Sequence, residues 1–423
     1  MEARLKRNVF FMALDAVVTI VASLTQLAVI AREYEPQFVG DYQFAQATLF
    51  LIWAFSCAGG ITMVVTRDLA TSDHSKHRSI ISNAVALQGV ISMLIVLGLY
   101  LLEGRFDASS SVITAILFGA IVSLLASLLQ VSQSLLVSAE KISTVASVSI
   151  GANIAATLIV ISASWAKVSL SALVIAVLSC QAIRAVWVTI LTKAWRYISL
   201  RLIKSNELLS LMRQALPVLV MIVATHLYVR VDVLMLTYWT DRETVARYGS
   251  AYAFLDQLMI LSNFMMGALF PNFARVALAR GVEYRTLYRG ILLLFGKYLL
   301  PIAVLIAIFS RSLLAGVYGP EYSQAGVALS ILMVAALFAW INGPAGTIFI
   351  SLGKQSLYMW ATIVSLVVNI IGNIILIPLV GAIGSAIATV LTEAALCIVC
   401  LVWIHQITGW LPWMEINERR DGT

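Results

Sequence analysis

The sequence is poor in charged residues. Asp, Glu, Lys and Arg make up 12% of its 423 residues, whereas hydrophobic residues make up 61%. Soluble domains carry roughly 25% charged residues, and the mean hydropathy here is +0.94. This deficit excludes an ordinary water-soluble globular domain. Apolar runs of about 20 residues recur along the whole chain, and a helix of this length crosses ~30 Å of hydrocarbon. We therefore predict an all-α polytopic membrane protein.

The chain also lacks the residues and motifs of most catalytic and metal sites. It has four Cys and four His, and it contains no G-x-x-x-x-G-K-[ST], H-E-x-x-H or G-x-S-x-G motif. Cys397 and Cys400 form a C-x-x-C within an apolar run, without a second Cys/His pair, so we interpret them as membrane-buried thiols. We therefore expect no enzyme activity, no built-in ATPase, no metal and no cofactor. If the chain moves a solute across a membrane, the energy would have to come from a coupling ion (sodium or proton), from the membrane potential or from consumption of the product.

A separate basic domain is absent too, although the net charge is +7. The basic residues lie in short clusters between the apolar runs, which is the pattern of the positive-inside rule and not of nucleic-acid binding. With the N-terminus in the cytoplasm, most Lys and Arg fall on the inner side, including those in the connections 193–213 and 271–289. We predict that both termini are cytoplasmic and that the basic N-terminus leads into the first span, in preference to a cleavable signal.

Hydropathy predicts twelve spans that divide into two halves. Residues 1–200 would form an N-terminal six-helix bundle and residues 201–423 a C-terminal one. Val39-Gly40-Asp41-Tyr42 at the second span matches Val245-Ala246-Arg247-Tyr248 at the eighth, so we predict parallel repeats. The spans are expected at about 8–30, 42–65, 80–102, 111–137, 143–163, 170–192, 214–240, 248–270, 290–309, 324–350, 356–377 and 382–406.

Ionisable residues inside spans are costly and normally face water or a partner, so they are the candidate functional residues. Arg230 lies deep in the seventh span, and His226 shares its face at i−4. One interpretation is that both offer cationic donors to an anionic headgroup in a central cavity. The alternatives are that Arg230 pairs with Asp15, Asp232 or Asp256, or snorkels to the outer interface.

Two further cations, and two stripes of polar side chains, can each be interpreted in two ways. Lys297 and Arg184 either line the pathway or snorkel to the cytoplasmic side. Asp15 leads a stripe with Thr19, Ser23 and Gln26 on one face of the first span, for which we favour a lumen or an ion role. For the stripe of the fourth span we favour hydrogen bonds between helices; its members are Ser123, Ser127, Gln130 and Ser134.

The remaining buried carboxylates, Asp232, Asp256 and Glu393, are candidate ion-coupling residues. Each could instead neutralise a basic partner. Two proline-containing segments, Asn342-Gly343-Pro344 and the one ending at Pro378, would permit helix bending.

The order and spacing of four segments resemble a known family. These segments resemble the polysaccharide-biosynthesis flippases of the multidrug/oligosaccharidyl-lipid/polysaccharide exporter superfamily, and above all the O-antigen and capsule repeat-unit translocases of the bacterial inner membrane. One departure is Ala246, where the family usually has glycine. The segments are Asn8 with Val39-Gly40-Asp41-Tyr42; Arg67-Asp68-Leu69-Ala70; Leu216-Pro217, Arg230-Val231-Asp232 and Tyr248; and Asn369 to Asn373, Leu376-Ile377-Pro378, Gly381, Gly384-Ser385-Ala386 and Ala388-Thr389 to Glu393.

This resemblance implies two six-helix bundles around a central cavity that is lined by spans 1, 2, 7 and 8 and works by alternating access. The implied substrate is a polyprenyl-pyrophosphate-linked oligosaccharide for O-antigen (lipopolysaccharide), capsule or exopolysaccharide synthesis. Membrane lipid, a polymerase and a chain-length regulator are the implied partners. The alternative is an ion-coupled multidrug/cation antiporter of the same superfamily, which the added positive charge disfavours. A membrane polymerase or ligase would need a large external loop, and the sequence has none.

Overall fold

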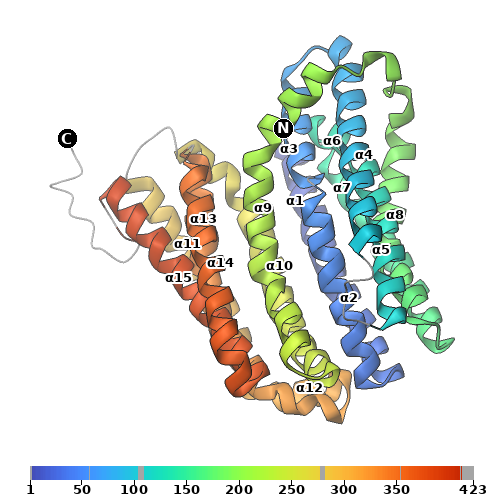
Figure 1. The fold of residues 1–423 in the computed structure, drawn as a ribbon. Coiled ribbons are helices and arrows are strands. Elements are labelled where there is room, and N and C mark those ends of the chain that lie inside the picture. The colour runs from blue at the N-terminus through green and yellow to red at the C-terminus, as the bar shows by residue number, and fades with distance from the viewer. Residues whose placement is uncertain are drawn as a thin grey trace. The chain divides into compact units, whose positions relative to one another are not determined.

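The computed structural model describes residues 2–56, 58–102, 109–276, 282–352, 354–409 and 411, which form helices joined by short connections (Figure 1). These ranges contain no strand, so the predicted all-α class is confirmed. Backbone contacts divide the chain into two compact units, Met1–Arg230 (unit 1) and Val231–Thr423 (unit 2). The boundary lies inside one long helix, and the predicted division at residue 200 stays a prediction.

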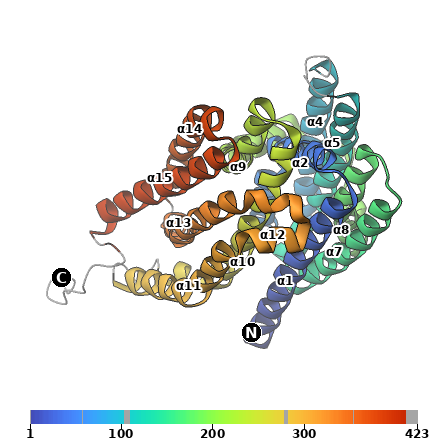
Figure 2. The same cartoon turned by 90° about the horizontal axis from the view of Figure 1, so that it is seen from below.

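Unit 1 is built around four mutually packed helices. In it α1 packs on α7, α7 on α8, and α8 on α5, and Figure 2 shows α1, α7 and α8 as neighbours. The helices of this unit are α1 (Glu2–Glu33), α2 (Pro36–Phe55), α3 (Ala58–Thr71), α4 (His77–Leu102), α5 (Ser110–Gln130), α6 (Gln133–Ser138), α7 (Ile142–Trp165), α8 (Leu170–Thr192) and most of α9 (Ser205–Trp239), with short 3-10 turns η1 (His74–Lys76), η3 (Ala194–Arg196) and η4 (Leu200–Leu202).

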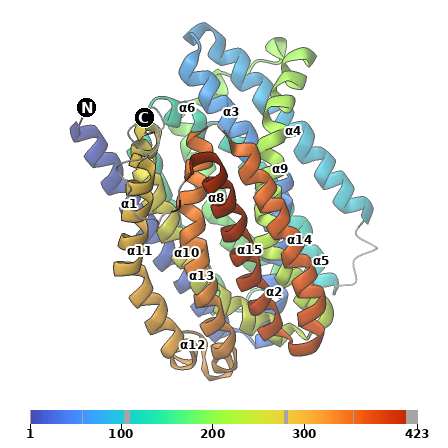
Figure 3. The same ribbon diagram turned by 90° about the vertical axis from the view of Figure 1, so that its left-hand side faces the viewer.

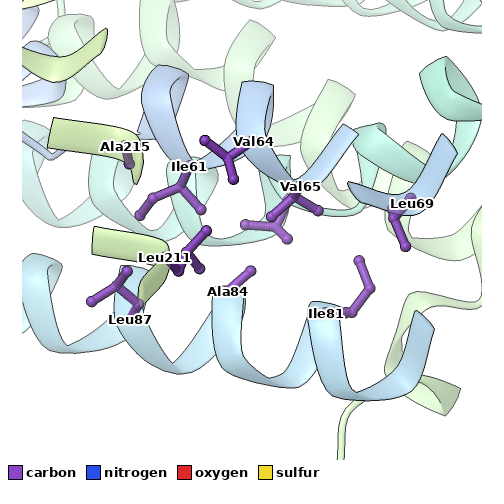
Figure 4. Close-up of a cluster of buried hydrophobic side chains, with 10 residues drawn as sticks. Ile61, Val64, Val65, Leu69, Ile81, Ala84, Leu87, Leu211 and Ala215 are labelled. Carbon is purple, nitrogen blue, oxygen red and sulfur yellow. The ribbon is translucent and has the colours of Figure 1, made fainter. Parts of the chain in front are cut away.

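A hydrophobic cluster joins α3, α4 and the beginning of α9 (Figure 4). Ile61 and Val65 of α3 are fully buried and face Ala84 of α4 and Leu211 and Ala215 of α9. Small and branched side chains let these helices approach closely, which is how helices associate where lipid offers no hydrophobic driving force.

The connection before α9 is attached to α4 by hydrogen bonds. Asn83 of α4 donates through Nδ2 to the carbonyl of Leu202 at 3.1 Å and to Glu207 Oε2 at 2.7 Å, and its Oδ1 accepts from the backbone N–H of Lys204 at 2.9 Å. The backbone N–H of Ser199 donates to Ser82 Oγ at 2.9 Å. The connection 193–213, which the sequence identifies only as basic, is thus fixed to the first half of the chain.

Unit 2 has α13 at its centre. The helix α13 packs on α10, α11 and α15, and α15 packs in turn on α14; Figure 3 shows α11, α10, α13 and α15 in succession. Beyond the end of α9, the elements are α10 (Arg242–Val276), α11 (Val282–Ile308), α12 (Ser310–Tyr318), the 3-10 helix η5 (Pro320–Ala325), α13 (Gly326–Ser351), α14 (Gln355–Val380) and α15 (Ala382–Thr408).

Glycine makes the tight turn between α14 and α15 possible. Gly381 adopts a positive φ of 58°, which L side chains rarely adopt. A Cβ on Gly384 would clash with the backbone of Leu376 and Ile377. The two helices therefore pack closely from their first shared turn.

A helix lies at each of the twelve predicted spans, but not all of them are equally apolar. Within the described residues, ten helices are long and apolar enough to cross a membrane, or up to eleven if the bent pair of α2 and α3 counts as one span. The described part of α10 is not among them. The protein is a multi-pass membrane protein, and the count of twelve stays a prediction.

Candidate functional site

The strongest candidate site in unit 1 is a cluster of aromatic and cationic side chains on α2 and α9, which we name the α2–α9 cluster. The Arg230 guanidinium lies 5.1 Å from the centre of the Phe50 ring. His226 stacks on the same ring at 4.5 Å and lies 5.6 Å from Trp53. His226 Nδ1 is 2.8 Å from the carbonyl oxygen of Ile222, four residues earlier in α9. The structure thus brings the predicted pair Arg230 and His226 together.

The geometry of this cluster suits an anion that carries polar groups. A guanidinium presents a planar fork of N–H donors that matches phosphate oxygens, and its attraction to the Phe50 ring holds it in place. All four side chains are partly exposed within their unit. The sequence-based search missed Phe50 and Trp53. Their spacing of three residues, which places both on one face of the second span, could have identified them as a pair.

Asp15 and Arg184 belong to a second polar group in unit 1, on α1, α7 and α8. Asp15 interacts electrostatically with Arg184, and Ser149 and Thr19 lie beside its carboxylate. Asn153 Nδ2 donates to Thr19 Oγ1 at 3.0 Å, and Cys180 Sγ donates to Asn153 Oδ1 at 3.0 Å. A carboxylate and a guanidinium are therefore brought together among three packed helices. Their predicted roles in binding substrate stay predictions.

The two predicted polar stripes contribute hydrogen bonds between helices. Gln26, in the stripe of the first span, donates to Thr157 Oγ1 of α7 at 3.0 Å. In the fourth span, Ser127 accepts from Gln88 at 3.1 Å and Ser134 donates to the carbonyl of Thr62 at 3.2 Å. Interhelical bonding by Ser127 and Ser134 is therefore confirmed.

Asp232 is fully buried in unit 2, two residues beyond the last residue of unit 1 in α9. Its Oδ2 accepts a hydrogen bond from the Tyr248 hydroxyl of α10 at 2.6 Å, and its Oδ1 accepts from the backbone N–H of Val233 at 2.7 Å. Ser385 and Thr389 of α15 lie at the same Tyr248 hydroxyl. Side chains of three helices, α9, α10 and α15, thus meet around the Tyr248 hydroxyl and the Asp232 carboxylate.

Glu393 forms a separate site in unit 2. It is buried on α15, and its Oε2 accepts a hydrogen bond from Asn342 Nδ2 of α13 at 2.7 Å. Cys397 and Cys400, on the next turns, are buried free thiols, as predicted, and Cys57 lies outside the described residues.

The last two predicted site residues, Asp256 and Lys297, lie in unit 2. Asp256 of α10 interacts electrostatically with Tyr318 of α12. Lys297 is exposed on α11, with its ammonium 5.2 Å from the ring centre of its neighbour Tyr298. Four of the eight candidates lie in unit 1 and four lie in unit 2. Over the part of the chain that the structure describes, no group of three or more His, Cys, Asp or Glu residues is placed to hold a metal ion.

Solved structures with this fold are membrane transporters. The lipid II flippase MurJ, in an inward closed conformation, superposes with a TM-score of 0.76 at 13% identity, over 93% of this chain and 87% of its own. An inward-facing multidrug resistance transporter of the MATE family reaches 0.72 at 15% identity, over 93% and 98%. A superfamily transporter from Pyrococcus furiosus reaches 0.68 at 14% identity, over 96% and 95%. The fold is thus that of the superfamily containing MurJ and the MATE transporters.

The chain belongs to the polysaccharide biosynthesis protein family, whose sequence profile matches residues 5–277. An uncharacterized membrane protein of Methanocaldococcus jannaschii is 30% identical over 184 residues, and the probable low-salt glycan biosynthesis flippase Agl15 of Haloferax volcanii is 25% identical over 175. These matches cover 42% and 40% of this chain but only 34% and 36% of the relatives. The family resemblance inferred from the four sequence segments is confirmed.

Proposed function

We propose that this protein flips a polyprenyl-pyrophosphate-linked oligosaccharide repeat unit across the membrane by alternating access. Membership of the polysaccharide biosynthesis family and the fold shared with transporters support this proposal. The observation that carries it is the α2–α9 cluster, in which Arg230 is held over Phe50 beside His226.

The barrier to be overcome is the transfer of a charged, hydrophilic headgroup through hydrocarbon. Burial of an unpaired phosphate charge is very costly, and charge-assisted bonds from a guanidinium offset part of that cost. Arg230 would contact the pyrophosphate, with His226 as a second donor. The rings of Phe50 and Trp53 would pack against the sugars, while the polyprenyl chain stays in lipid.

We propose the bacterial inner membrane as the setting, with both termini in the cytoplasm. The product would be O-antigen, capsule or exopolysaccharide, and a polymerase and a chain-length regulator would act downstream. The two relatives described above are archaeal. The broader form of this proposal is therefore a lipid-linked glycan as the substrate. The bacterial polymers are the narrower form of the proposal.

Energy for the cycle would come from a coupling ion or the membrane potential. The candidate ion-coupling residues are Asp232 with its Tyr248 partner, Glu393 with Asn342, and Asp256. Lys297, Asp15 and Arg184 remain proposed substrate contacts at other stages of the cycle.

A multidrug/cation antiporter is the second candidate function, because a MATE transporter shares the fold. Aromatic rings such as Phe50 and Trp53 also attract organic cations. Arg230, however, already occupies the Phe50 ring and repels a second cation. We therefore favour the anionic lipid-linked substrate.

The test is Arg230→Ala in cells that depend on this protein for surface polysaccharide, with membrane insertion checked by immunoblot of the membrane fraction. We expect surface polysaccharide to be lost, and Arg230→Lys to restore only part of it because a lysine cannot form the bidentate contact. Arg201→Ala, an exposed arginine in η4, is the matched control and should behave as wild type.

Normal polysaccharide in Arg230→Ala would contradict the headgroup role. A wild-type protein that exports organic cations from vesicles and leaves the lipid-linked oligosaccharide in place would favour the antiporter.

A further inference from the structure

Glu393 lies near the middle of α15 (Ala382–Thr408) in an unusually uncharged part of unit 2. The residue is only 9% exposed. The two helices that pack extensively on α15, α13 and α14, contain no Asp, Glu, Lys, Arg or His. No ion pair involves Glu393 within the described residues. An ionised carboxylate at this position would be a buried and unpaired charge, which is strongly unfavourable.

The side chain that contacts Glu393 is Asn342 of α13, itself 4% exposed. Asn342 Nδ2 lies 2.7 Å from Glu393 Oε2 and 3.1 Å from its backbone carbonyl oxygen. The other atom of the same amide, Asn342 Oδ1, is buried and has no hydrogen-bond partner. A buried acceptor without a donor is costly.

Protonation of Glu393 would remove both costs, the buried unpaired charge and the buried acceptor without a donor. A carboxylate can only accept hydrogen bonds, whereas a carboxylic acid has one O–H donor and keeps an acceptor oxygen. With a proton on its other oxygen, Glu393 can donate to Asn342 Oδ1 while Asn342 Nδ2 donates to Glu393 Oε2. This reciprocal acid–amide pair satisfies the orphan acceptor and leaves no buried charge.

We propose that Glu393 and Asn342 form a proton-binding site, in which Glu393 takes up a proton from water and holds it against the Asn342 amide. The inference deepens the proposed function, since it assigns the coupling ion as a proton and places it at this site. Sodium is the alternative ion, and the experiment below separates it from a proton.

The position of Asn342 connects this site to a break in α13. Asn342 directly precedes Gly343 and Pro344, and Pro344 has no N–H for the carbonyl of Trp340. The Tyr288 hydroxyl of α11 donates to the neighbouring carbonyl of Ile341 at 2.7 Å. Because a proline-containing helix can bend at this point, the acid–amide pair fastens α15 to the segment of α13 that is able to move. Bending there would admit water and release the proton.

The other titratable groups near the pair are neutral side chains. The hydroxyl of Tyr358 on α14 and the thiols of Cys397 and Cys400 on α15 interact with Glu393. The helix α10 makes only a small contact with α15. Its charged residues whose side chains the structure describes are Arg242, Glu243, Arg247 and Asp256, and none of them contributes to the electrostatics of Glu393.

The site can be tested by infrared difference spectroscopy of the full-length protein in lipid vesicles across a pH series. A protonated carboxyl has a carbonyl band that is separate from the carboxylate bands. We expect the wild type to lose such a band as pH rises, and Glu393→Gln, which retains the shape and an amide donor, to lack it. Glu243→Gln, an exposed acid paired with Arg247, is the matched control and should keep the band. Asn342→Leu should move the band to higher frequency, because the hydrogen bond to the acid is lost.

Three outcomes would overturn the site: a band that persists in Glu393→Gln, a band that does not change between wild type and Asn342→Leu, or a band that sodium chloride removes at constant pH while choline chloride does not. Flipping of a lipid-linked oligosaccharide in the same vesicles separates the two proposals. Absence of flipping with the band present contradicts the proposed function alone. Flipping that keeps its dependence on a pH gradient in Glu393→Gln contradicts the proton site alone.

Discussion

Two helices at matching places in the two halves, α2 and α10, begin alike and then differ in their polar partners. Val39 and Tyr42 of α2 are buried, as are Val245 and Tyr248 of α10. Each Val is the fourth residue of its helix. Only Tyr248 donates to a buried carboxylate, that of Asp232. The two helices thus share these packing positions, whereas their polar partners differ.

The membrane carboxylates show the same divergence. Asp15 of unit 1 has a guanidinium, Arg184, in electrostatic range. Asp232 and Glu393 of unit 2 are held by a tyrosine hydroxyl and an amide. A nearby cation reduces the cost of a buried carboxylate charge, whereas the amide beside Glu393 carries no charge that could do so. This difference supports the proposed proton site at Glu393 in unit 2.

The largest expected effect compares Tyr248→Phe with Tyr42→Phe. Removal of the Tyr248 hydroxyl takes a donor from the fully buried Asp232, and hydrogen bonds to charged groups contribute about 1.5–3 kcal/mol. We expect a clear fall in thermal stability in detergent for Tyr248→Phe and a change within about 0.5 kcal/mol for Tyr42→Phe. Equal losses in both variants would show that the two tyrosines have the same role.

The next effect tests the electrostatic interaction between the Asp15 carboxylate and Arg184 in unit 1. Arg184→Met leaves Asp15 without its cation, and we expect a loss of about 1–2 kcal/mol, below the ~3–5 kcal/mol of a fully buried pair because Asp15 is half-buried. The double variant Asp15→Asn with Arg184→Met should recover most of that loss in the same thermal assay. If the single and the double variant are equally unstable, Arg184 acts by packing and not by charge.

The smallest effect concerns the residues that precede the two helices. Asp241 caps α10, with its Oδ1 2.6 Å from the backbone N of Thr244, and this hydrogen bond lowers the pKa of Asp241. Glu35 at the start of α2 makes no such bond. Because the folded pKa is depressed, the cap stabilises above the unfolded pKa of about 3.9 and is lost as pH falls through the lower folded value. Asp241→Ala should cost about 0.5–1 kcal/mol at neutral pH.

The pH dependence of thermal unfolding provides the check on this cap. The difference between wild type and Asp241→Ala should shrink in acid. Glu35→Ala should show little difference at any pH, and a loss of stability as large as that of Asp241→Ala would mean that α2 is capped in the same way.

Patterns within one helix could be read from the sequence, and contacts between helices could not. The spacing of four residues placed His226 and Arg230 on one face, and both meet Phe50. That ring comes from a different span, so no local spacing could identify it. In the same way, the sequence singled out Asp15 and Arg184 separately as membrane charges. Their proximity depends on the packing of α1, α7 and α8.

Glu393 illustrates the same limit in unit 2. A lone carboxylate in an apolar span was recognisable as a candidate, but its dependence on Asn342 follows from the packing of α13 against α15. Span positions were predictable because they follow from hydropathy. The helix α10 lies at the predicted eighth span, and whether it crosses the membrane stays a prediction.

The central position of Glu393 along α15 also has an electrical consequence. A full crossing of one elementary charge against 100 mV corresponds to about 2.3 kcal/mol, so a proton that stops halfway senses about 1 kcal/mol of that field. Occupancy of this carboxyl would then change several-fold per 100 mV, even at constant pH on both sides. The protein would in this way sense the membrane potential through the protonation of a single acid, with no need for a gating arginine helix.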